Sequence, residues 1–157
     1  TVWGGGYIKP QNHTDTIDFV VTQTFGDATD FGNLTQSRGH MGSVSSSTRG
    51  IWYGGSIYGP DAPAYTIYNI IDYITIASTG NATDFGDTRF ANSGIHFTNA
   101  AASNSTRGVF GGGTTPSAQV DIMYVTIATT GNASDFGDLT STKYQGGGAS
   151  DAHGGLG

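Results

Sequence analysis

A short motif recurs three times along the chain, and it constrains the fold more than any other feature. The copies occupy residues 25–33, 79–87 and 130–138, and each contains Ala, Thr or Ser, Asp, Phe and Gly in that order. Successive copies lie about 50 residues apart, a spacing typical of propeller blades and solenoid repeats. The sequence therefore predicts a single repeat domain over residues 1–157, in which the other features are read once per repeat.

The composition favours many short strands joined by tight turns. Glycine accounts for 26 of the 157 residues, while 36% are hydrophobic and 11% aromatic. The net charge of −6, from 6 basic and 12 acidic side chains, disfavours nucleic acid as a partner, because phosphate binding needs a basic surface. The absence of cysteine excludes disulfides and thiolate metal ligands. No apolar run approaches the ~18 residues of a transmembrane helix, so no membrane span is expected.

Each repeat contains the same elements in the same order. An apolar strand ends in a glycine cluster, a second apolar strand follows, then the motif, and then a strand of small residues. In chain order these elements are 1–6, 16–21, 25–33 and 39–46; 50–55, 70–76, 79–87 and 94–103; and 108–113, 122–127, 130–138 and 146–150. We therefore predict an all-β fold of four-stranded units. Counted from the small-residue strand, which the first unit lacks, the units span approximately 1–37, 38–88 and 89–142, with a partial unit at 143–157.

The order of these elements resembles the blades of kelch-like, galactose-oxidase-type β-propellers. The matching features are Arg38 before a small-residue strand, the pair Gly54-Gly55, Tyr73, and a motif Phe followed by Leu, as in Phe31 and Leu34. Phe stands where that family usually has Trp, and its spacing to Leu differs from the usual one. The activity of galactose oxidase does not carry over, since its copper site needs a cysteine that this chain lacks.

Residues 72–87 and 105–113 also resemble repeats found in structural and tail-fibre proteins of marine cyanobacterial bacteriophages. That resemblance implies a non-enzymatic virion structural or fibre protein with a virion or extracellular location. Its expected role is assembly or attachment to a host surface. Its expected partners are other virion proteins or copies of itself, and a cell-surface glycan.

Three units are too few for a closed propeller, which typically has 4 to 8 blades. The chain starts without Met and in the middle of a repeat, which suggests a processed product or part of something longer. Either further repeats lie beyond the ends, or several chains assemble into one ring, two copies giving six blades. A threefold β-prism, also built from three four-stranded sheets, is the alternative fold.

Acidic and amide side chains in the motif raise the question of a metal. Asn81, Asp84 and Asp87, and the matching residues Asn132, Asp135 and Asp138, offer oxygen ligands that calcium prefers. Turn formation by Asn81 and Asp84 explains the same residues without an ion, and no cofactor is expected. The triplet Asp84-Phe85-Gly86 lacks the other kinase motifs, and no catalytic residue is assigned.

Aromatic residues near the long loop of the second unit are the candidates for ligand binding. Trp52, Tyr58 and Tyr65 lie near this Pro-containing loop, and exposed aromatic rings can stack on sugars. A carbohydrate-binding, lectin-like module is therefore the alternative function. Other residues are assigned structural roles: Phe31, Phe85 and Phe136 between sheets, and Arg49 and Arg107 as donors to carbonyls of neighbouring units or to acidic loops.

Overall fold

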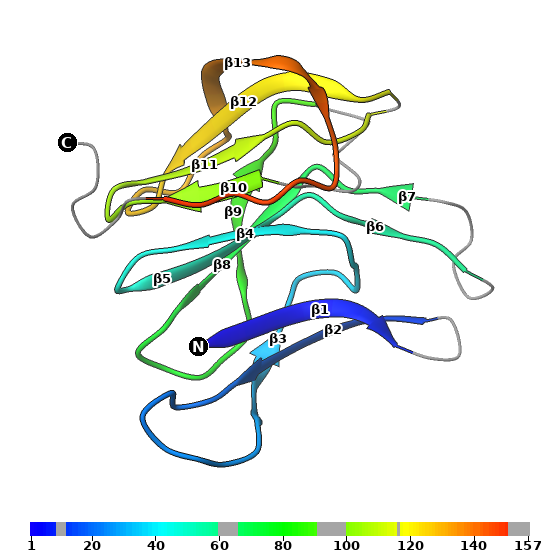
Figure 1. The fold of residues 1–157 in the computed structure, drawn as a ribbon. Coiled ribbons are helices and arrows are strands. Elements are labelled where there is room, and N and C mark those ends of the chain that lie inside the picture. The colour runs from blue at the N-terminus through cyan, green and yellow to red at the C-terminus, as the bar shows by residue number, and fades with distance from the viewer. Residues whose placement is uncertain (9–11, 60–65, 91–99, 116, 151–157) are drawn as a thin grey trace.

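The computed structural model describes residues 1–8, 12–59, 66–90, 100–115 and 117–150. Within them the chain forms strands β1 to β13 in four antiparallel sheets and no helix, which confirms the all-β prediction. None of these residues therefore belongs to a helix that could cross a membrane. The three larger sheets lie one above another, from the N-terminal sheet at the bottom of Figure 1 to the C-terminal sheet at the top.

The three larger sheets follow one another along the sequence. The first contains β1 (Val2–Ile8), β2 (Asn12–Phe19) and β3 (Thr29–Asn33); the second contains β4 (Gly42–Ser45), β5 (Arg49–Tyr53), β8 (Ile70–Thr75) and β9 (Thr83–Asp87); the third contains β10 (Ala100–Ser103), β11 (Arg107–Gly111), β12 (Gln119–Thr126) and β13 (Ser134–Lys143). We call these the first, second and third units. Within the described residues they do not close into a ring of blades.

A small hairpin inside the second unit was missed by the sequence analysis. Strands β6 (Ser56–Ile57) and β7 (Thr66–Ile67) pair in a region predicted only as a surface loop. The hairpin is held against the preceding linker, because Ser56 exchanges backbone hydrogen bonds with Gly39. A bond between residues this far apart leaves no local pattern in the sequence.

The units repeat in backbone conformation as well as in sequence. One glycine of each glycine cluster has a positive φ: 63° at Gly5, which lies inside β1, and 63° at Gly54 and 79° at Gly112, which directly follow β5 and β11. A side chain at Gly5 would place its Cβ 2.5 Å from the carbonyl oxygen of Arg38, and one at Gly112 would come within 2.4 Å of that of Lys143. Glycine is therefore required there by both backbone angle and space.

The core lies between the sheets in two clusters. One, between the first and second units, contains Ile17, Phe31, Leu34, Trp52 and Ile74. The larger one, between the second and third units, contains Val44, Ile51, Tyr53, Ile71, Phe85, Phe110, Met123, Val125, Ile127 and Ala133. Of the three motif phenylalanines, Phe31 and Phe85 are buried, whereas Phe136 is 53% exposed because no further unit of the described chain covers it.

Candidate functional site

The recurring motif forms the contact between consecutive units. From the turn before β9, the amides of Gly80 and Ala82 donate to the carbonyls of Phe31 and Asn33, both at 2.7 Å. The side chain of Asn81 adds a third bond, its Oδ1 accepting from the Asn33 amide at 3.1 Å. The second motif copy therefore offers two backbone donors and one side-chain acceptor to the unit before it, and the first copy offers two carbonyl acceptors and one amide donor in return. We call this contact the outer-turn junction.

The second outer-turn junction repeats the first. The amides of Gly131 and Ala133 donate to the carbonyls of Phe85 and Asp87 at 2.7 and 2.8 Å, and Asn132 Oδ1 accepts from the Asp87 amide at 3.0 Å. The backbones approach so closely that a Cβ on Gly86 would lie 2.6 Å from the Gly131 carbonyl. The motif therefore requires glycine at this step, because no side chain fits between the two backbones.

The acidic and amide side chains of the motif bond in two ways, the acids within their own copy and the amides to the preceding unit. Asp30 Oδ1 and Asp84 Oδ1 accept from the amides of Gly32 and Gly86, which are the local turns expected of this residue type. Asn81 does not form the local turn predicted for it; its amide oxygen bonds to the preceding unit instead. Within the described part of the chain, no group of three or more His, Asp or Glu side chains is arranged to hold a metal ion.

A fully buried ion pair joins the first and second units. Arg38 Nη1 lies 2.9 Å from Asp72 Oδ2, and both side chains have no solvent exposure. Arg38 also donates from Nε to the carbonyl of Gly54 at 2.8 Å, while Asp72 accepts from the amide and hydroxyl of Thr35. The two charges thus neutralise each other and bond to surrounding dipoles, while Arg38 Nη2 is buried without a hydrogen-bond partner in the described structure.

The two arginines singled out from the sequence hold strands together. Arg49 donates from Nη1 to the carbonyl of Ile127 in the third unit at 2.9 Å, and its guanidinium lies 4.6 Å from the ring centre of Tyr73. Arg107 lies over Tyr124 at 4.9 Å in the same way. Both cations are therefore engaged with aromatic faces.

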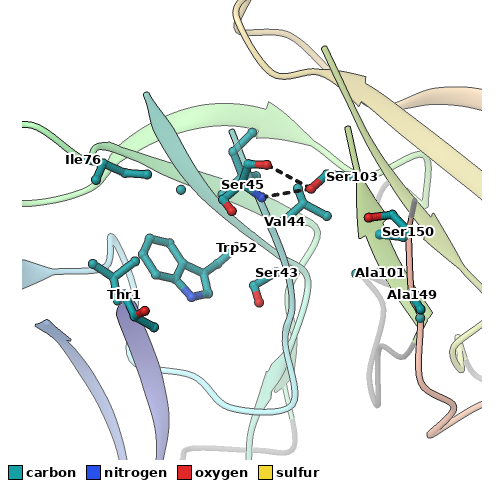
Figure 2. Close-up of a pocket in the computed structure, with 15 residues that line it drawn as sticks. Thr1, Ser43, Val44, Ser45, Trp52, Ile76, Ala101, Ser103, Ala149 and Ser150 are labelled. Atoms are coloured by element: carbon teal, nitrogen blue, oxygen red, sulfur yellow. Dashed lines mark hydrogen bonds between the residues drawn. The ribbon is translucent and has the colours of Figure 1, made fainter. Parts of the chain in front are cut away.

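The inner ends of the three units enclose a groove of about 400 Å³, shown in Figure 2. It is lined by the N-terminal residues, by β4, β5 and β10, and by residues 148–150. Ser103 Oγ donates to the Ser45 carbonyl at 2.9 Å across the contact between β4 and β10. The side chains that line the groove are small, apolar or hydroxylated and carry no charge. The groove therefore offers no acid, base or nucleophile pair for catalysis.

A cluster of two tyrosines and two histidines lies where the first unit meets the hairpin of the second. The Tyr58 ring is nearly parallel to those of Tyr7 and His40, at centroid distances of 5.9 and 5.7 Å. His13 contacts Tyr58 edge-on at 5.0 Å. The cluster therefore packs the first unit against the second through aromatic contacts. Tyr7, 47% exposed, and Tyr58, 36% exposed, reach the surface.

Burial lowers the pKa of both histidines in this cluster. His13 is only 8% exposed, and neither ring nitrogen has a hydrogen-bond partner within the described structure. Desolvation lowers its pKa below the ordinary value of 6.5, and the nearby His40 lowers it further. Desolvation also lowers the pKa of His40. The neutral form of His13 is therefore the form that fits this packing.

The structure separates the residues predicted to bind a ligand. Trp52 is 5% exposed, lines the inner groove, and lies against Gly4, where an added Cβ would come within 2.8 Å of the indole ring. Tyr58 belongs instead to the aromatic cluster, and Tyr65 lies outside the described residues. The sequence analysis missed Tyr7, because nothing in the sequence indicates that the end of β1 meets Tyr58.

No protein family matches the chain, and no curated protein matches it either. The conclusions about function therefore rest on the residues themselves. These form repeated contacts between units, a groove without charged side chains, and an aromatic cluster that is partly open to solvent.

Proposed function

We propose that the chain is a non-enzymatic structural protein of a virion, built of kelch-like β-propeller repeats and used in assembly or in attachment to a host surface. The observation that carries this proposal is the outer-turn junction, formed twice with the same donors and acceptors. A motif that recurs three times, and whose backbone amides and carbonyls bond to neighbouring units, serves architecture.

The charged residues of the described chain support the same role. The groove carries no charged side chain, and the buried ion pair and the arginines act between strands or units. A ring or fibre needs such contacts between repeats, since each repeat contacts only its neighbours. The partners are other virion proteins or further copies of this chain.

The proposal is tested on virus particles purified from a lysate that contains the protein. Immunogold electron microscopy with an antibody against this chain should label the particle surface or a tail fibre. Mass spectrometry of the same particles should find the protein in a fixed ratio to the major capsid protein. Recovery of the protein only from the soluble fraction would contradict the proposal.

A carbohydrate-binding module is the second candidate, favoured by the exposed part of the aromatic cluster. Tyr7 and Tyr58 present partly exposed rings beside the imidazole of His40, which is the combination of stacking face and polar atoms that sugar recognition uses. A glycan array tests this candidate with Tyr7→Ala and Tyr58→Ala, and with Tyr144→Ala, an exposed tyrosine elsewhere, as control. Binding lost only in the first two variants would support it, and no binding by the parent chain would reject it.

A further inference from the structure

The two outermost faces of the molecule carry the two unmatched halves of an outer-turn junction. Gly26 and Ala28 stand in the first motif where Gly80 and Ala82 stand in the second, but among the described residues their amides have no hydrogen-bond partner. At the other end, no turn of the described chain bonds to the third motif as the second motif bonds to Phe31. One face thus offers the two backbone amides of an outer-turn junction, and the other offers the two backbone carbonyls that accept from such amides.

Apolar side chains that are buried inside the molecule are exposed on these two faces. Phe136 is 53% exposed, whereas Phe31 and Phe85 at the same motif position are 5% and 3% exposed. Trp3 is 54% exposed, whereas Trp52 at the same strand position is 5% exposed. In the interior, this burial is supplied by the neighbouring unit. The exposed residues therefore mark surfaces that lack such a neighbour.

The two faces also carry opposite charges in the positions of the buried ion pair. Lys143 stands where Arg38 does: the carbonyl of Arg38 accepts from Gly6, and that of Lys143 from Gly113, both at 2.9 Å. Asp18 stands where Asp72 does, since it lies opposite Trp3 as Asp72 lies opposite Trp52. Both Lys143 and Asp18 are exposed, and neither has an ion-pair partner within the described chain.

The segment after β13 follows the path that leads from the first unit into β4. His40 and Gln145 are the two non-glycine residues with positive φ in the described chain, at 58° and 59°, and each lies nine positions after its motif Phe. Residues 147–150 then run beside β10, with the backbone of Gly148 against Ala101. Residues 147–150 occupy the position that β4 has in the second unit. However, no described strand lies beside them as β5 lies beside β4. Conversely, β1 pairs with β2 alone among the described strands, whereas β5 pairs on both edges.

We propose that a second copy of this chain binds head to tail, the first unit of one copy docking on the third unit of the other. Strand β1 then pairs with residues 147–150 of its neighbour, and the amides of Gly26 and Ala28 bond to the carbonyls of Phe136 and Asp138. Lys143 of one copy pairs with Asp18 of the other. This inference deepens the proposed assembly role and rests on it. It commits to a second copy because one placement, already used twice inside the chain, satisfies the bonds, the apolar contacts and the charges together.

Sedimentation velocity of the purified chain over a series of concentrations tests the proposal. The parent chain should form species at multiples of its 16.2 kDa mass. Asp18→Lys and Lys143→Asp should each weaken association about tenfold or more, because they place like charges together. Mixing the two variants should restore association. In the mixture, Lys143 of the Asp18→Lys variant faces Asp18 of the Lys143→Asp variant. Where the opposite ends of the two variants meet, the two substituted side chains face each other and also have opposite charges.

A backbone variant gives an independent test of the same interface. Ala28→Pro removes an amide that has no partner within the described chain, so it should weaken association while leaving the monomer folded; Ala28→Ser keeps the amide and is the control. Circular dichroism checks the fold of every variant. A 16.2 kDa monomer at all concentrations, or association unchanged by these variants, would overturn the interface. Neither result would decide virion incorporation, which the immunogold experiment measures separately.

Discussion

The two contacts between consecutive units share the same outer-turn hydrogen bonds and differ in the residues that are packed between the sheets. Between the first and second units, the fully buried Arg38–Asp72 pair lies close to a modest apolar cluster around Trp52. Between the second and third units the interior is apolar: the ring centroids of Tyr53 and Phe110 lie 3.9 Å apart, and Met123 occupies the register position that Asp72 has in the second unit. The backbone bonds of the outer turns are nevertheless the same. The repeated motif therefore determines the hydrogen bonds that join the units, whereas the residues packed between the sheets differ from one contact to the next.

The largest effect is expected from removing Asp72, the acid of the buried ion pair between the first and second units. Asp72→Ala leaves Arg38 charged, buried and unpaired, and should lower the free energy of unfolding by about 3–5 kcal/mol, measured by urea denaturation. Asp18→Ala is the matched control, because Asp18 is exposed and has no ion-pair partner in the described chain, and should change stability by less than about 0.5 kcal/mol at concentrations where the chain is monomeric. Replacing Arg38 and Asp72 together by Met should recover much of the loss. Equal effects at positions 72 and 18 would contradict this account.

Smaller effects are expected at the two outer-turn junctions, and they should be equal to each other. Asn81→Ala and Asn132→Ala each remove one acceptor of a backbone amide, and each should cost about 1 kcal/mol in the same denaturation experiment. Asp27→Ala, at the same motif position but with no preceding unit in the described chain, should have no effect on the monomer. Costs that differ strongly between Asn81 and Asn132 would show that the two outer-turn junctions are not equivalent.

Tyr53→Phe probes the apolar junction and should change stability by no more than about 0.5 kcal/mol. The Tyr53 hydroxyl is buried and has no hydrogen-bond partner in the described structure, and this burial raises the pKa of the phenol. Removing an unsatisfied polar atom costs nothing in hydrogen bonds and relieves a desolvation penalty. Thermal unfolding of the variant measures the change. A loss above about 1 kcal/mol would mean that the hydroxyl has a bonding role.

The smallest expected effect is a dependence of stability on pH, which arises from His13 in the aromatic cluster. Since the pKa of folded His13 lies below its ordinary value of 6.5, the folded protein binds fewer protons than the unfolded chain. The stability that His13 contributes is therefore complete above about pH 7 and is lost progressively as the pH falls below 6.5. His13→Phe should reduce the difference in melting temperature between about pH 7.5 and about pH 5. An unchanged difference would exclude His13 as a source of the pH dependence.

The sequence predicted the all-β fold and the order of elements because these follow from local periodicity and glycine placement. It did not predict what Asn81 bonds to, because its partner Asn33 belongs to another unit. The pairing of Arg38 with Asp72 was missed for the same reason: Arg38 was noted only as a feature of the repeat, and only the packing of the sheets brings the two side chains together. Tyr58 was noticed as a surface aromatic, but its contacts with Tyr7 and His13 depend on the unpredicted β6–β7 hairpin.

The outer-turn junctions also determine how the molecule opens. Each junction ties a unit only to its immediate neighbour, so the second unit is held from both sides and the first and third from one side each. In such a linear array, local opening starts at the ends and moves inward. Amide hydrogens of β5 and β8 should therefore exchange with solvent more slowly than those of β1 and β2. Head-to-tail contacts at both ends of a chain would remove this gradient, because each end unit would then gain the neighbour that it lacks.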